Sequence, residues 1–152
     1  MPTLLVQSCS ATKNHVTKPT RAIDVYDGYF FRIIKKAMRE GAFRSDIELR
    51  ILSAEHGLLR ADDKITNYDR RMTPSRASEL REYVTEDLRH CISNGDYETV
   101  IMNMGSVYTQ AVGDISNQDD VDITYVNGDG IGTKGRKLKQ MVRNDMGGEV
   151  NA

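Results

Sequence analysis

Short apolar runs alternate with longer amphipathic segments along this chain, and this alternation constrains its fold more than any other feature. The apolar runs, each of strand length, are residues 3–7, 47–53, 99–103 and 121–126. The amphipathic segments, each with helical spacing, are residues 25–40, 75–91, 105–112 and 133–144. Strands that alternate with helices form parallel βαβ units, and the helices cover both faces of the sheet. We therefore expect one Rossmann-like three-layer α/β domain over residues 1–152, with a mainly parallel sheet of about four strands.

Two segments lack the period of a helix or a strand, and we expect both to be loops. They are residues 13–21, which are polar, and residues 54–74. Long loops in compact domains are usually functional or disordered. Asp24 is the candidate cap of the first helix, and Ser75 is the expected start of the second.

The composition excludes several classes of protein. At 152 residues the chain is long enough to bury a core without disulfides or a metal. Its two cysteines, Cys9 and Cys91, give neither a disulfide framework nor a zinc-ligand spacing, so we expect no metal and no cofactor. No apolar run approaches the roughly 20 residues of a membrane span. The first residues also make a poor signal peptide, so we expect a cytoplasmic protein with no membrane partner.

The charge balance bears on nucleic acids as partners. The formal net charge is −1, which argues against coating nucleic acid by charge alone but leaves room for a local basic groove. The chain has no tryptophan and only 7% aromatic residues, which disfavours an aromatic platform for stacked bases. The oligomeric state stays open at this level.

Small, polar and glycine residues gather directly after each apolar run. The four segments are residues 8–13, 53–57, 103–108 and 128–134. In a parallel sheet they follow the carboxyl ends of the strands, where open α/β sheets bind their ligands. The sequence therefore predicts one ligand site at that edge, and we include Gly105 from the third segment among its contacts.

The first of these segments combines hydroxyls, a thiol and a lysine. Small residues let backbone amides approach a ligand, hydroxyls bind phosphate or ribose, and a lysine adds positive charge. We assign Ser8, Ser10 and Lys13 to ligand binding. Cys9 is a candidate nucleophile if a neighbouring base activates it, and the alternative of a small, inert core cysteine stays open.

The second segment and the loop after it supply candidates for proton transfer. His56 is the natural side chain for moving a proton near neutral pH, and Asp69 offers a carboxylate. An equally open alternative is that His56 only hydrogen-bonds the backbone of a turn. The candidate ligand contacts in this part of the site are Ser53, Gly57, and the rings of Tyr26 and Tyr68, which could stack on a base.

Glycines followed by basic residues mark the last segment. Gly130 and Gly132 lie at the expected start of a helix, where backbone amides favour an anion, so we assign both to ligand binding. The candidate contacts with DNA or RNA are Arg70, Arg71, Lys134 and Arg136. Two alternatives stay open: a glycine turn before a solvated basic helix, and arginines whose ion pairs order the long loop.

Several short motifs together resemble those of a known family. They are Ser8-Cys9-Ser10-x-x-Lys13, Asp24-x-Tyr26-x-Gly28-x-x-Phe31, Leu52-Ser53-Ala-x-His56-Gly57-Leu58, Tyr68-Asp69, and Gly130-Ile131-Gly132 with Leu138-Lys139. In this combination the chain resembles an uncharacterised family of small bacterial, archaeal and phage proteins with a C-S-x-x-K start and an S-A-x-H-G-L motif. The resemblance covers most of the chain.

Two better-known groups are similar at a greater distance. The central domain of archaeosine synthase, a tRNA-modifying enzyme, has a similar P-C-S-x-x-K-P-Y start. Peroxide-stress proteins of the YaaA type have a stretch similar to residues 52–59. Gln7 stands where the archaeosine relative has proline, and Asn67 stands where the others have it. The resemblance implies an α/β domain associated with nucleic acids or modified bases, and it assigns no reaction.

Two functions from different classes follow as expectations. In the first, the chain binds a nucleobase, nucleoside or nucleotide at the carboxyl ends of the strands and takes part in nucleic-acid base modification. Its chemistry is then that of a transferase or is N-glycosidase-like, with His56, Asp69 and Cys9 as the candidate catalytic residues. In the second, the chain is a non-catalytic DNA- or RNA-binding stress-response protein. Whether it is an enzyme, and whether it needs a partner enzyme, stays open.

Overall fold

A five-stranded central sheet organises the molecule, which is described here by a computed structural model over residues 2–115 and 121–145. The strand order is β4-β3-β1-β6-β7. The strands are β1 (Thr3–Ser8), β3 (Ile47–Ser53), β4 (Gly57–Arg60), β6 (Thr99–Asn103) and β7 (Asp122–Tyr125). β1 is parallel to β3 and β6, β6 is parallel to β7, and β4 alone pairs antiparallel, with β3. The mainly parallel sheet expected from the sequence is confirmed, with β4 as an additional edge strand.

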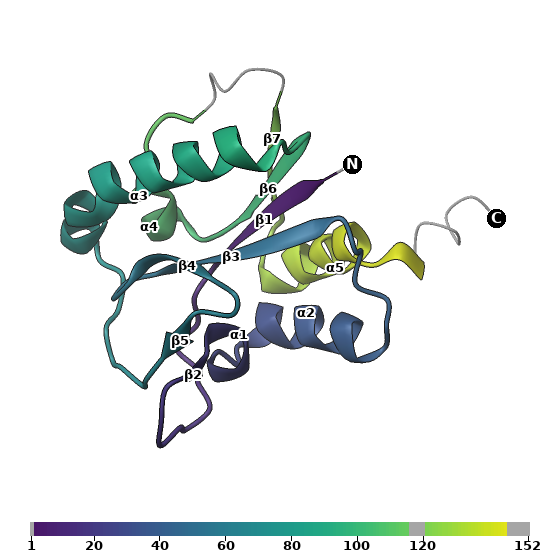
Figure 1. Cartoon of the computed structure of the whole chain (residues 1–152), viewed down its shortest axis with the longest axis horizontal. Helices are drawn as coiled ribbons and strands as arrows, with labels where there is room; N and C mark the ends of the chain where they lie inside the picture. The colour runs from purple at the N-terminus through teal and green to yellow at the C-terminus, as the bar shows by residue number, and fades with distance from the viewer. Residues whose placement is uncertain (1, 116–120, 146–152) are drawn as a thin grey trace.

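Helices cover both faces of this sheet, which confirms the three-layer arrangement. Figure 1 shows α3 and α4 on one face and α1, α2 and α5 on the other. The helices are α1 (Ala22–Val25), α2 (Tyr29–Arg39), α3 (Pro74–Gly95), α4 (Ser106–Thr109) and α5 (Ile131–Val142). A separate two-stranded ribbon pairs β2 (Thr20–Arg21) with β5 (Lys64–Ile65). No helix within the described ranges is long and apolar enough to cross a membrane.

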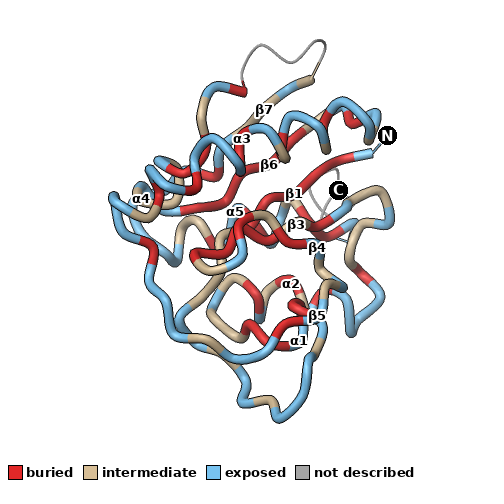
Figure 2. Tube along the Cα trace, turned by 60° about the vertical axis from the view of Figure 1, so that its left-hand side comes forward, coloured by how far each residue is buried: buried red, intermediate tan, exposed pale blue. Residues whose placement is uncertain are grey.

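The sheet divides the hydrophobic core into two clusters. Leu4 and Val6 of β1 face the cluster under α3, whereas Leu5 faces the cluster under α2 and α5. All three are fully buried, as are most of the central strands in Figure 2. A strand covered on both faces has no polar face, and this explains why the run is continuously apolar instead of alternating.

The first helix differs from its prediction over residues 25–40. The structure has the short α1, a break at residues 26–28, and then α2. Tyr26 is extended, with φ −74° and ψ 134°, and forms an antiparallel bridge with Lys13. The Tyr26 N–H still donates to the carbonyl of Ala22 at 3.1 Å, but the extended backbone at Tyr26 ends α1 at Val25. Asp24 therefore lies inside α1 and forms an ion pair with Arg21, and its predicted role as a helix cap is wrong.

The segment over residues 54–74 is also more ordered than the sequence predicts. It contains β4 and β5, two strands too short to show a period. The helix after it begins one residue earlier than predicted, at Pro74, because Thr73 and not Ser75 provides its cap. The Thr73 hydroxyl accepts a hydrogen bond from the backbone N–H of Arg76 at 3.1 Å. The helix also continues to Gly95, beyond the expected end near Cys91.

Two glycines of the predicted site should respond oppositely to substitution by alanine. Gly57 has φ +75°, and a Cβ there would lie 2.9 Å from the ring of Tyr83, so Gly57→Ala should lower the free energy of unfolding by about 1–2 kcal/mol. Gly132 lies in α5 with open space around it, so Gly132→Ala should leave that free energy unchanged or raise it by up to about 1 kcal/mol. Urea denaturation of both variants checks this, and equal destabilisation would contradict it.

Candidate functional site at the carboxyl edge of the sheet

The loops that follow β1, β3, β6 and β7 meet at one edge of the sheet, because these strands are all parallel. The thiol of Cys9, after β1, lies 3.0 Å from the hydroxyl of Tyr108, after β6. Lys134, after β7, donates from Nζ to the carbonyl of Met104 at 3.3 Å. Three of the four segments singled out in the sequence, residues 8–13, 103–108 and 128–134, are therefore in direct contact.

A chain of three hydroxyls lies at the centre of this edge. The Tyr26 and Tyr68 hydroxyls are 2.5 Å apart, and the Tyr68 hydroxyl is 2.9 Å from Ser53 Oγ. Ser53 Oγ also accepts from the backbone N–H groups of Glu55 and His56, at 3.1 and 3.0 Å. These two bonds fill both acceptor positions of the serine oxygen, so Ser53 donates to Tyr68. Three hydroxyl protons then serve two bonds, and the third can be offered to a ligand only by Tyr68, because Tyr26 is fully buried.

Lys13 carries its charge directly above this chain. Its Nζ lies 4.5 Å from the centre of the Tyr68 ring and 5.9 Å from that of Tyr26, within the range of cation–π attraction. Its hydrogen bond goes to the carbonyl of Ala11 at 3.4 Å, and no described carboxylate pairs with it. An ammonium group offers three donors, so Lys13 can also bind an anion.

The start of α2 lies beside this lysine. Gly28, the residue before the helix, donates its N–H to Ser10 Oγ at 3.1 Å, and Ser10 Oγ donates to the carbonyl of Thr12 at 2.7 Å. A Cβ at Gly28 would lie 2.4 Å from the Ser10 Cβ, so only glycine permits this approach. Our sequence reasoning did not select Gly28 as a site residue, although it lies in one of the motifs.

The two candidates for proton transfer flank Tyr68. His56 is exposed, and the edge of its ring meets the Tyr68 ring with the centres 5.2 Å apart. Asp69 follows Tyr68 in the chain, is exposed, and has no hydrogen bond or ion pair among the described residues. Both side chains are therefore accessible to a ligand at this edge.

Burial keeps the phenols of the site protonated. It raises the pKa of Tyr26 from 10 to about 12. The pKa values of Tyr68 and Tyr108 are also raised, first by burial and then by the nearby charge of an ionised Cys9. The three phenols are therefore neutral hydrogen-bonding groups near pH 7 and not proton-accepting bases. Cys9 is half-buried among them, and the structure brings no nitrogen base into hydrogen bond with its thiol among the described residues.

A buried amide pair lies next to the site and was not selected from the sequence. Asn103 Nδ2 donates to Gln7 Oε1 at 2.8 Å, and both residues are almost completely buried. Asn103 Oδ1 has no hydrogen-bond partner among the described residues. A buried acceptor without a partner costs about 1–3 kcal/mol, and such groups in native proteins call for an explanation. The sequence signal is an amide at or next to the carboxyl end of each of two largely apolar strands.

The remaining predicted contacts divide between structural and exposed positions. Ser8 ends β1, and Gly57 forms the turn into β4. Gly105 precedes α4, Gly130 precedes α5 with φ +144°, and Gly132 lies in the first turn of α5. All three of these glycines are exposed, and a Cβ at any of them would meet no neighbour within 4 Å.

The arginines of the long loop differ in what they contact. Arg70 pairs with Glu55 at 3.0 Å, as expected of a residue that orders the loop. Arg71 is exposed without a described partner. Arg76 donates to the carbonyls of Ala54 and Glu55 and so braces the turn that carries His56. Arg136 lies away from this loop, in a groove between α2 and α5.

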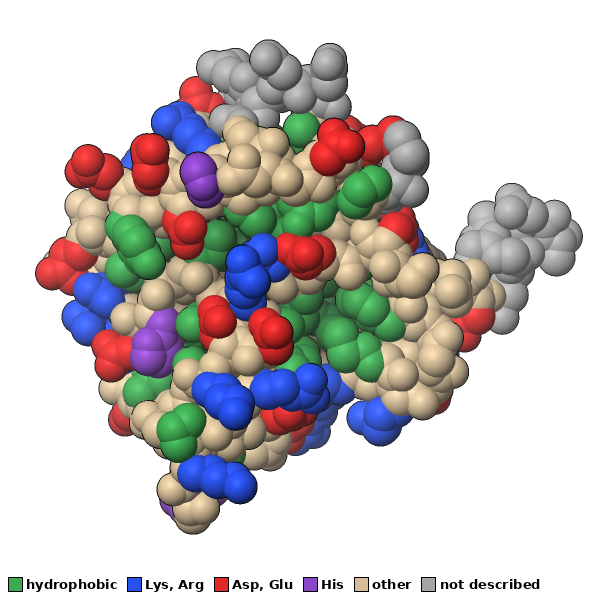
Figure 3. Space-filling view, viewed as in Figure 1, with side chains coloured by type: hydrophobic (Ala, Val, Ile, Leu, Met, Phe, Trp, Pro, Cys, Tyr) green, Lys and Arg blue, Asp and Glu red, His purple; other side chains and the backbone are tan. Residues whose placement is uncertain are grey.

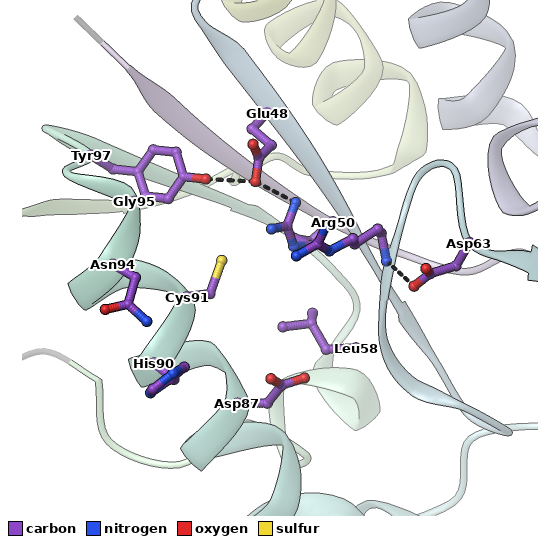
Figure 4. A pocket seen from close by; sticks show the side chains of 11 residues that line it. Glu48, Arg50, Leu58, Asp63, Asp87, His90, Cys91, Asn94, Gly95 and Tyr97 are labelled. Carbon is purple, nitrogen blue, oxygen red and sulfur yellow. Dashed lines mark hydrogen bonds and ion pairs between the residues drawn. The ribbon is translucent and has the colours of Figure 1, made fainter.

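A hollow of about 500 Å³ lies under the carboxyl-terminal half of α3, away from this edge. Figure 4 shows Tyr97 and Arg50 both directed at Glu48; the Tyr97 hydroxyl donates to Glu48 at 2.7 Å, and Arg50 forms an ion pair with it. These contacts lower the pKa of Glu48, the Tyr97 bond most of all. In the space-filling view of Figure 3, acidic and basic side chains adjoin near the centre of this face. The charges of Glu48 and Arg50 in this hollow are therefore matched within the protein.

Among the described residues no group of three or more His, Cys, Asp or Glu side chains could hold a metal ion.

The protein is thus a three-layer α/β domain whose polar loops converge at the carboxyl ends of its strands. The sequence matches the model of a family of unknown function (DUF6884) over residues 4–140, and the chain belongs to that family. The expectation of an uncharacterised family is thus confirmed. No curated protein matches the chain significantly.

The fold is shared with a solved structure. The chain is similar to AF0587, a protein of unknown function, with a TM-score of 0.56 and 14% sequence identity. The match covers 92% of this chain and 44% of that one, so our chain spans less than half the length of that relative. At this identity the likeness shows the fold alone.

Alkaline titration should separate the buried phenols from the others. Of seven tyrosines, four have a raised pKa: Tyr26, Tyr68, Tyr97 and Tyr108. Because the folded-state pKa of Tyr26 exceeds the ordinary value of 10, its contribution to stability is complete below pH 10 and is lost as pH rises toward 12. That contribution is on the order of 2 kcal/mol.

Near-ultraviolet absorbance should therefore show part of the phenols ionising well above pH 10, together with loss of the folded circular-dichroism signal. Tyr68→Phe should remove one phenol from this late group, and protein in denaturant should titrate in a single step. A single step near pH 10 in the intact fold would contradict the prediction.

Proposed function

We propose that the chain binds a nucleobase, nucleoside or nucleotide at the carboxyl edge of its sheet and takes part in nucleic-acid base modification. The observation that carries the proposal is the position of Lys13. This ammonium group has no described carboxylate partner and lies over the ring of Tyr68, whose hydroxyl belongs to a chain with one unused proton. A cation beside aromatic rings and a spare donor suits a phosphate joined to a base.

Two positively charged features of the edge would bind the phosphate of such a ligand. Lys13 provides a full charge, and the start of α2 at Gly28 provides backbone N–H groups and the positive end of the helix dipole. The Gly28 N–H is held by Ser10 Oγ at 3.1 Å, but Gly28 has no side chain to cap the N–H groups of the first turn, and Asp27 beside it is paired with Lys35 at 3.2 Å. The local field therefore favours an anion.

The base end is supported by the hydroxyl chain. Tyr68, the less buried phenol of the pair, can donate to a carbonyl or ring nitrogen, and burial, which raises its pKa, keeps that proton in place near pH 7. Asn103 Oδ1, a buried acceptor without a described partner, marks the same edge as unusual for a simple structural core. The distant resemblance to the central domain of archaeosine synthase and to YaaA-type proteins points to the same class of ligand.

The chemistry we propose acts at the bond between sugar and base. In cleavage, water adds to C1′ while the bond to the base nitrogen breaks. His56 donates a proton to the departing base, and Asp69 accepts the proton of the water. The products are a free base and a free sugar hydroxyl. In transfer, an incoming base replaces the water. Cys9 is the candidate nucleophile if the reaction passes through a covalent step.

Nucleotide binding should depend on Lys13. We expect adenosine or guanosine 5′-monophosphate to bind at least about tenfold more tightly than its nucleoside, because a charge-assisted hydrogen bond contributes about 1.5–3 kcal/mol. Lys13→Met should remove this difference, whereas Lys64→Met, at an exposed lysine on β5, should preserve it. Calorimetric titration measures all four affinities.

A second variant separates the two ends of the ligand. Tyr68→Phe breaks the hydroxyl chain and should weaken nucleoside and nucleotide by the same factor. The proposal fails if neither ligand binds at millimolar concentration, or if the Lys13 and Lys64 variants behave alike.

A non-catalytic nucleic-acid-binding protein is the second candidate function, and the basic groove between α2 and α5 favours it. Under this alternative the protein binds an oligonucleotide and releases it unchanged. Chromatography of the oligonucleotide after incubation would then find neither a free base nor an altered one.

A further inference from the structure

A groove of about 530 Å³ runs between α2 and α5, which lie side by side on one face of the sheet (Figures 1 and 2). Tyr29 and Lys36 line it from α2, and Gly135, Arg136 and Lys139 line it from α5. Both helices begin at the carboxyl edge, so the groove starts beside the candidate site and extends away from it. From Tyr29 to Lys36 the helix rises about 10 Å.

One aromatic ring lies exposed in this groove. Tyr29 is 47% exposed although it is a large, largely apolar side chain. A Cβ at Gly135 would lie 2.5 Å from atoms of that ring, so the glycine lets the ring rest directly on the backbone of α5. The contact is made by the outer end of the ring, its Cε2, Cζ and hydroxyl atoms, and the exposed remainder of the side chain offers surface on which a flat, unsaturated group can stack.

Three cations line the groove together with this ring. Lys36, Arg136 and Lys139 are exposed and have no ion pair among the described residues. The other two arginines of the groove differ: Arg143 is held by Glu40 and Asp145, and Arg32 lies 3.3 Å from Asp27. Positive charge is thus concentrated here in a chain whose formal net charge is −1. Lys36 and Lys139 lie near enough to Glu40 and Asp145 to help lower the pKa values of these carboxyls, but neither lysine forms an ion pair with a described residue.

We propose that this groove binds a single-stranded nucleic acid, with phosphates on Lys36, Arg136 and Lys139 and a base stacked on Tyr29. A ring can stack only on a base that is not paired within a duplex, which selects single strands. Each of the three cations can contact one phosphate of such a strand. An acidic polypeptide would satisfy the cations but would not use the ring.

This inference deepens the proposed function, because it names the substrate as a nucleic-acid strand. It rests on the proposed function in one respect, that the carboxyl edge beside the groove binds a nucleotide. A strand in the groove would bring a neighbouring nucleotide to the carboxyl edge, where Lys13 and the hydroxyl chain lie.

Fluorescence anisotropy with a labelled oligothymidylate tests the groove. We expect the logarithm of the binding constant to fall with the logarithm of salt concentration with a slope of about −2, as three phosphate contacts on a single strand require. Replacing Lys36, Arg136 and Lys139 together with alanine should weaken binding at low salt at least tenfold and bring the slope toward zero. Tyr29→Ala should weaken binding at least about fivefold, and Tyr29→Phe should restore it.

A matched control removes the same charge elsewhere. Arg39→Ala, Lys64→Ala and Lys137→Ala together delete three exposed cations, two of them on the same helices, and none of them lines the groove. This variant should bind the oligonucleotide like the wild type. Melting curves confirm that every variant is folded.

Several outcomes would overturn the inference: no binding at low salt, equal loss in the groove and control variants, tighter binding of duplex DNA, or equal binding of polyglutamate with no effect of Tyr29→Ala. The last result would assign the groove to an acidic polypeptide. If nucleoside monophosphates fail to bind while oligothymidylate binds through the groove, the proposed function at the edge fails and the groove stands. If nucleoside monophosphates bind at the edge but oligothymidylate does not bind through the groove, the groove proposal fails and the proposed function stands.

Discussion

The buried ring of Tyr26 connects the parts of the candidate site to one another. Its extended backbone interrupts the helix and pairs with Lys13, which places that ammonium group over Tyr68. Its hydroxyl bonds to Tyr68 and its ring stacks on Phe31 of α2 at 5.2 Å. A phenol taken from water needs a hydrogen-bond partner, and here that partner belongs to the long loop after β5. Burial of one side chain therefore fixes the first loop, the start of α2 and the long loop in a single arrangement.

The sequence predicted those elements whose residues show a regular hydrophobic pattern. Buried runs such as residues 47–53 and 99–103 predicted the parallel strands, and the polar residues after them predicted which loops meet. It failed where a tertiary contact overrides local preference. Residues 25–40 have helical spacing throughout, but the pairing of Tyr26 with Lys13 breaks the helix, and β4 forms only because β3 offers an edge to pair with. The roles of Tyr108 and Gly28 also depend on neighbours 99 and 18 residues away, which no local pattern reveals.

The carboxyl edge and the groove share one origin in the topology. Helices that follow parallel strands begin at the carboxyl edge, so α2 and α5 both direct their positive ends toward it. The same parallel course brings the two helices together along their length, and Gly135 lets them approach closely enough for Tyr29 to lie on the backbone of α5. A concentration of positive potential in a chain of nearly zero net charge thus follows from how the elements are connected.

The amide pair of Gln7 and Asn103 has a consequence for how the sheet assembles. Neighbouring parallel strands can slip by two residues and still keep every side chain on its own face, so apolar contacts alone discriminate weakly between such alignments. Slipping β1 by two residues against β6 would place Gln7 opposite Ile101 and leave both amides unpaired in the core. That costs about 1–3 kcal/mol for each unpaired group. The pair therefore selects one alignment of the two central strands during folding, and the loops at their ends meet only in that alignment.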